Sequence, residues 1–196
     1  QTGPELRRLA MALGAGEESL HLAEAATEAN VKALDLSSTS VIAFTTHGLL
    51  SGELSGLAEP ALVLTPPDAA SPDDDGLLTA SEIAELRLST DWVILSACNT
   101  AGTDGRPDAE GLSGLARAFL YAGARSILVS HWPVRDDAAA RLTTGTLSRI
   151  GEDATIGRSQ ALRQAMLSLM EDENDQSLAH PSAWAPFMVV GEGGRS

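Results

Sequence analysis

The stretch Trp92-Val93-Ile94-Leu95-Ser96-Ala97-Cys98-Asn99-Thr100 decides the fold of this chain. Four apolar residues run into small residues, and the only cysteine of the chain follows at once. An apolar run of this length that ends in polar and glycine residues predicts a buried parallel strand followed by a loop. Ligands of open α/β sheets bind beyond the carboxyl ends of such strands, so Cys98 lies where chemistry is expected.

A second apolar run, Val41-Ile42-Ala43-Phe44-Thr45-Thr46-His47-Gly48, has the same design. It predicts another buried strand, with His47 at its carboxyl end and Gly48 behind it. Neighbouring strands of a parallel sheet would bring His47 and Cys98 to the same edge. We therefore predict that the two strands are adjacent and parallel.

Length and composition predict one well-cored domain. The chain has 196 residues, of which 43% are hydrophobic and 4% aromatic, and this favours an aliphatic core over disorder. The formal net charge of −14 argues against nucleic acid and anionic membranes as partners, because both attract clustered lysine and arginine. No apolar run reaches the roughly 18 residues of a membrane-spanning helix. A single cysteine excludes an internal disulfide and a multi-cysteine metal cluster, and it fits a reducing compartment such as the cytoplasm.

Helix and strand signals alternate along the chain, which predicts an α/β domain with a mainly parallel sheet covered on both faces. Residues 49–78 are rich in glycine, proline and acid and predict a long loop, within which 61–65 could form a short strand. The chain opens with a helix and not with a strand, so we expect residues 1–196 to be a single domain cut from a longer protein. Further strands are expected at 20–22, 126–130 and 187–190, and helices at 6–13, 28–34, 80–86, 112–122, 136–150 and 156–170.

Capping residues mark two of the helix starts. Thr27 is expected to cap a helix in which Val31 and Leu34 face inward. Thr79-Ala80-Ser81-Glu82 is a capping box, which begins the helix at 80–86.

A cysteine and a histidine at one sheet edge point to nucleophilic catalysis. The thiolate is the reactive form, and a histidine within hydrogen-bond reach can take the thiol proton and later give it to the leaving group. The backbone N–H groups of Gly48 and Cys98 could hold the oxyanion. Two alternatives stand beside this hypothesis. Cys98 could be a small buried hydrophobe, as most lone cysteines are, and His131, which ends the strand at 126–130, is a rival partner for Cys98.

Several motifs, in one order along the chain, resemble the CHAT family of caspase-like cysteine peptidases. The matches extend from about Thr27 to Gly191. At one position the chain departs from the family, because the place of His131 is more often held by an apolar or small polar residue. The matching motifs are His47-Gly48 after an apolar strand, Asp75–Ile83, Leu95–Thr100, Glu110-Gly111-Leu112, Ala118–Ser126, Trp132-Pro133-Val134, His180-Pro181 and Trp184-Ala185-Pro186-Phe187.

The resemblance implies a caspase-like three-layer α/β/α sandwich and a Cys–His dyad, in which His47 is the base and Cys98 the nucleophile. Such a domain would be a cysteine endopeptidase that cleaves a protein or peptide through a thioester intermediate, without a cofactor or a metal. It would also be preceded by tetratricopeptide repeats in the longer protein. Ser130 and Trp132 are candidate substrate-binding residues, although Trp132 is equally well explained as a packing aromatic.

Other functions stay open. A catalytically silent homologue would act as a protein-binding or regulatory module, and the presence of both dyad residues argues against it. A small-molecule or nucleotide enzyme is less favoured, since the chain has no glycine-rich phosphate-binding loop. Asp104, Asp108 and Glu110 could bind a cation, but carboxylates in loops are usually just solvated. His180, beside Pro181, is expected to be a turn residue.

Overall fold

The main sheet of the computed structural model has four strands in the order β1-β5-β6-β7. The structure describes residues 2–71, 73–96, 111–132, 134–153 and 155–194. β1 pairs in parallel with β5, β5 pairs in parallel with β6, and β7 runs antiparallel to β6. The prediction that the first two strands are adjacent and parallel is therefore confirmed. The strands span Val41–Phe44 (β1), Trp92–Leu95 (β5), Ser126–Ser130 (β6) and Phe187–Gly191 (β7).

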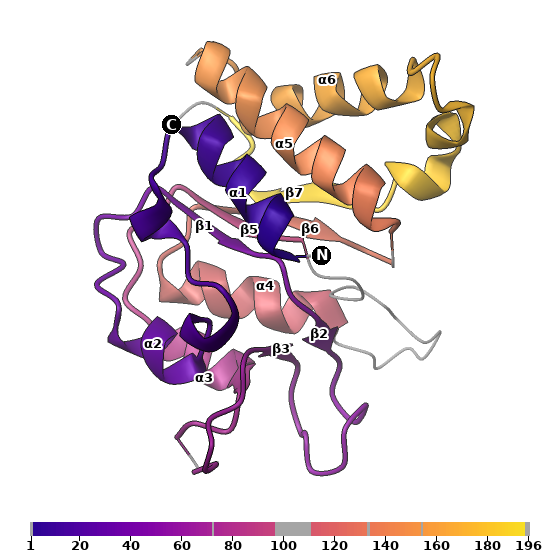
Figure 1. Ribbon diagram of the computed structural model, residues 1–196. Coiled ribbons are helices and arrows are strands. Elements are labelled where there is room, and N and C mark those ends of the chain that lie inside the picture. The colour runs from indigo at the N-terminus through magenta and orange to yellow at the C-terminus, as the bar shows by residue number, and fades with distance from the viewer. Residues whose placement is uncertain (1, 72, 97–110, 133, 154, 195–196) are drawn as a thin grey trace.

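Helices cover both faces of this sheet, which gives the expected three-layer α/β/α arrangement (Figure 1). One face carries α1 (Thr2–Leu13), α5 (Asp136–Glu152) and α6 (Arg158–Met170). The other carries α4 (Gly111–Ala122), with α2 (Glu28–Ala33) and α3 (Ala80–Glu85) beside it. Within the described ranges, no helix combines the length and the apolar composition that a membrane crossing requires.

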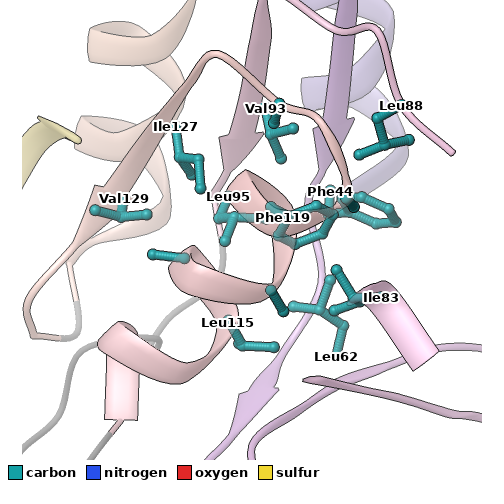
Figure 2. Close-up of a cluster of buried hydrophobic side chains, with 14 of the residues drawn as sticks. Phe44, Leu62, Ile83, Leu88, Val93, Leu95, Leu115, Phe119, Ile127 and Val129 are labelled. Carbon is teal, nitrogen blue, oxygen red and sulfur yellow. The ribbon is translucent and has the colours of Figure 1, made fainter. Parts of the chain in front are cut away.

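Alternate residues of the central strand build two cores. Val93 and Leu95 belong to the cluster under α3 and α4, whereas Trp92 and Ile94 belong to the cluster under α1, α5 and α6. This follows from the two-residue period of a strand, which sends successive side chains to opposite faces. Since both faces are covered, every position is apolar, as the continuous run predicted. Figure 2 shows the first cluster gathered around Phe119, whose ring centroid lies 5.7 Å from that of Phe44.

A second, three-stranded antiparallel sheet lies within the region predicted as a loop. Its order is β2-β3-β4, and it follows directly from the turn that carries His47. Leu62 and Leu78 face each other in register and are fully buried, so packing against the core stabilises strands too short to show a sequence period. The loop prediction for 49–78 is therefore only partly correct. The strands span Gly48–Leu49 (β2), Ala61–Val63 (β3) and Leu77–Thr79 (β4).

Both capped helix starts are confirmed. The Thr27 side chain accepts the N–H of Asn30 at 3.2 Å, and Thr79 and Glu82 cap each other reciprocally. The inward position of Leu34 is wrong, because α2 ends at Ala33 and Leu34 is 40% exposed.

The strand predicted at 20–22 is also wrong. Backbone bonds from Leu20 to Glu17 and from Ala25 to Leu22 curl this segment into two single-turn helices, so it has no extended stretch to pair. These helices are η1 (Glu17–Ser19) and η2 (Ala23–Ala25). Two more, η3 (Gln176–Ala179) and η4 (Pro181–Ala183), precede β7.

Candidate active site

His47 stands at the turn between the two sheets. Its carbonyl accepts the N–H of Val63 at 2.8 Å, and the Thr46 hydroxyl donates to the carbonyl of Val63. The backbone of this turn is therefore held by β3, while the imidazole of His47 is exposed. A side chain fixed at its backbone but open to solvent is suited to meeting a ligand.

Cys98 lies outside the described residues, and the chain is followed up to Ser96. The N–H of Ser96 donates to the carbonyl of Phe44 at 3.0 Å, so the ladder between β1 and β5 continues one residue beyond the strands. Phe44 is the register partner of Leu95. His47 and Cys98 each follow three residues after a member of this pair.

A cleft of about 570 Å³ lies at the carboxyl ends of the three parallel strands. His47, Ser96 and Ser130 come from the ends of β1, β5 and β6, and the first turns of α1 and α5 complete the walls. This is the edge at which open α/β sheets bind ligands. The lining residues are Pro4, Glu5, Arg8, Thr45, Thr46, His47, Ser96, Ser130, Val134, Asp136, Asp137, Ala139, Ala140, Arg141 and Phe187.

Glu5 is a buried carboxylate of the cleft that sequence analysis missed. Its side chain comes from α1, Glu5 is only 8% exposed, and Oε1 accepts the Ser96 hydroxyl at 2.7 Å. Burial raises the pKa of Glu5, although the Ser96 hydrogen bond and the charge of Arg8 act in the opposite direction; Asp136 adds to the rise. One signal was available in the sequence, because Glu5 precedes the buried Leu9 by one helical turn and so shares its face.

The other predicted site residues lie at or near this edge. Ser130 is buried and lines the cleft, whereas Trp132 is 42% exposed and is not among the lining residues. His131 is exposed, its ring Nε2 faces the Met188 sulfur, and it does not line the cleft either. Gly48 is buried and begins β2, opposite Leu62.

Comparison with known proteins identifies the family. The model of the CHAT domain matches residues 1–192, which is nearly the whole chain. The chain belongs to the CHAT domain family. This family is related to the caspase-like peptidases, in agreement with the parallel sheet and its helical layers.

This CHAT domain is also similar to a part of two much longer proteins. Tetratricopeptide repeat protein 28 of Mus musculus is 35% identical over 119 residues, which is 59% of this chain. Tetratricopeptide repeat protein 28 of Homo sapiens is 34% identical over 115 residues, again 59% of this chain. The match covers only 4% of either relative, so it concerns the CHAT domain and not the whole protein.

Metal binding finds no support in the described part of the CHAT domain. There, no group of three or more His, Cys, Asp or Glu side chains is arranged to hold a metal ion. The loop carboxylates Asp104, Asp108 and Glu110 lie outside the described residues. The ring Nδ1 of His180 accepts the N–H of Ser182 at 3.2 Å, so His180 caps the short helix η4 as a turn residue does.

Proposed function

We propose that this CHAT domain is a cysteine endopeptidase, with Cys98 as the nucleophile and His47 as the base. The observation that carries the proposal is the register of β1 and β5. Phe44 and Leu95 are partners in the ladder, and each is followed three residues later by a member of the dyad. Equal extensions from paired positions favour side chains that meet at the same edge.

The chemistry would follow the order of acyl transfer through a thioester. His47 takes the thiol proton, and the thiolate of Cys98 attacks the carbonyl carbon of the scissile peptide bond. The oxyanion is held by the N–H groups of Gly48 and Cys98. The C–N bond then breaks, His47 gives its proton to the departing amine, and a water molecule hydrolyses the thioester with His47 again as base.

The position of the cleft supports His47 over His131 as the base. His47 lines the cleft, whereas the ring of His131 lies beside Met188 and away from it. Ser130 lines the cleft and is proposed to contact the substrate, and Trp132 would do so only from outside the described cleft. The substrate would be a protein, and tetratricopeptide repeats of the same polypeptide could present it. The activity fits a reducing compartment such as the cytoplasm, where a lone thiol stays unoxidised.

Alkylation with iodoacetamide tests the dyad, because Cys98 is the only cysteine and all label reports on it. Between pH 6 and 7, Cys98 should react at least about five-fold faster than N-acetylcysteine amide. A lowered pKa increases the thiolate fraction more than it reduces nucleophilicity. His47→Ala should remove most of this advantage. His131→Ala is the matched control and should stay within about two-fold of the parent.

Cleavage of a protein library by the parent, lost in Cys98→Ala, would complete the test. If Cys98 reacts no faster than the free thiol, in this domain and in the longer protein with its partner bound, the dyad hypothesis fails. The domain would then act as a protein-binding module. A loss of reactivity in His131→Ala, but not in His47→Ala, would assign the base to His131.

A further inference from the structure

The cleft contains a buried carboxylate whose hydrogen-bonding capacity is only partly used. Glu5 Oε1 accepts the hydroxyl of Ser96, but Glu5 Oε2 has no hydrogen-bond partner and Glu5 makes no ion pair among the described residues. A carboxylate offers about four acceptor positions, and a buried charge is costly unless it is paired. A cation bound in the cleft would supply the missing partner.

Four other charged residues around the cleft are already neutralised in pairs. Asp137 pairs with Arg135 at 2.6 Å. Arg141 pairs with Asp172, whose carboxylate is mostly covered. These pairs leave the balance of charge in the cleft to the residues that have no such partner.

Glu5, Asp136 and Arg8 decide that balance. Asp136 is close enough to Glu5 to disfavour its charged form, and Arg8 is close enough to favour it. Arg8 is exposed and makes no hydrogen bond or ion pair among the described residues, so water solvates it in place of a carboxylate. Two carboxylates against one solvated guanidinium leave the interior of the cleft negative.

Apolar residues form the rest of the walls near these carboxylates. Val134, Ala139, Ala140 and Phe187 all line the cleft and are buried. Lysine and arginine combine an apolar stem with a cationic end, and such side chains bury the stem along apolar surface. The combination of apolar walls and a buried carboxylate matches both parts.

We propose that the cleft binds a lysine or arginine side chain of the substrate, the one that precedes the scissile bond, with Glu5 as its main ligand. This inference rests on the proposed peptidase function for the role of the side chain, but not for the binding of the cation. Glu5 is then a specificity-determining residue. Its hydrogen bond from Ser96 fixes the carboxylate to the end of β5.

Binding of two matched probes to the Cys98→Ala domain tests the cation site without cleavage. N-acetyl-arginine amide and N-acetyl-citrulline amide have nearly the same shape and differ in charge. NMR titration should give at least about ten-fold tighter binding of the arginine probe, since hydrogen bonds to charged groups are the stronger ones. Adding Glu5→Gln should reduce the ratio to about two-fold or less, while Arg8→Gln should increase it. Exposed Glu18→Gln is the control and should leave the ratio unchanged.

Glu5→Gln keeps an oxygen that accepts from Ser96, and Asp136→Asn provides a second variant that alters no buried group. Equal binding of the two probes, or an unchanged ratio in both variants, would overturn the proposal. Peptides with arginine or citrulline before the cut separate the two proposals in the uncut, cysteine-containing domain. Cleavage of both at equal rates would overturn this inference and leave the peptidase function standing. Glu5-dependent binding without any cleavage would uphold the cation site and overturn the peptidase function.

Discussion

Replacing Glu28 should destabilise the domain more than any surface substitution. Glu28 is fully buried at the start of α2. Its Oε2 accepts the N–H groups of Asp75 and Gly76 at 3.0 and 3.1 Å, and its Oε1 accepts the ammonium of Lys32 at 2.5 Å. Lys32 in turn donates to Glu82 at 2.8 Å, so one carboxylate joins α2, α3 and the turn before β4.

Glu28→Ala leaves two backbone donors and a half-buried ammonium without this partner. Removing one member of such a buried group typically costs about 3–5 kcal/mol of the free energy of unfolding. In a chain of 196 residues this corresponds to a fall in Tm of about 6–20 °C. Urea titration followed by circular dichroism measures the loss.

Two control variants sharpen this experiment. Glu85→Ala removes an exposed carboxylate from α3 and should change the free energy of unfolding by less than about 0.5 kcal/mol. Glu28→Gln retains an acceptor oxygen for the backbone donors and should lose less than Glu28→Ala. If Glu28→Ala costs less than about 1 kcal/mol, the cluster behaves as a surface ion pair and the reasoning is refuted.

Two further predictions concern stability. Gly123 has φ +114°, and a Cβ there would lie 2.1 Å from the carbonyl oxygen of Leu88, so Gly123→Ala should cost at least twice the roughly 1 kcal/mol expected for Gly14→Ala. Gly14 has φ +67° with no described atom within 4 Å of a Cβ, and equal losses in urea titrations would show that the contact with Leu88 relaxes freely. Because burial raises the pKa of Glu5, its native form binds protons more readily than its unfolded form, and the free energy of unfolding should fall as pH rises through that pKa. Glu5→Gln should remove this fall and gain stability relative to the parent at pH 7 but not at pH 4. A constant difference in thermal scans at the two pH values would contradict the raised pKa.

Local signals predicted the elements that local physics decides. The run at Trp92 required a strand covered on both faces, and the capping box at Thr79 required a helix start, because both depend on neighbours in sequence. The segment around Leu20 alternates like a strand, but it has no partner to pair with. β4 was missed for the opposite reason, since Leu78 is extended only because Leu62 lies opposite it.

The same distinction separates the site residues that the sequence predicted from the one that it missed. His47 follows an apolar run, and a strand end is visible in the sequence itself. Glu5 reaches the site through a contact with Ser96, 91 residues away in the chain. No spacing rule connects these two positions, so only the packed structure shows the carboxylate in the cleft.

The docking of α1 has a consequence for the order in which the domain folds. Leu9, on the buried face of this helix, packs in the cluster that contains Trp92, Leu128 and Leu142. During synthesis the helix therefore has no apolar surface to cover until α5 has left the ribosome, and an isolated helix of this length is marginal in water. The first helix to be made is among the last to find its place. The wall of the cleft that contains Glu5 closes only when most of the chain is already complete.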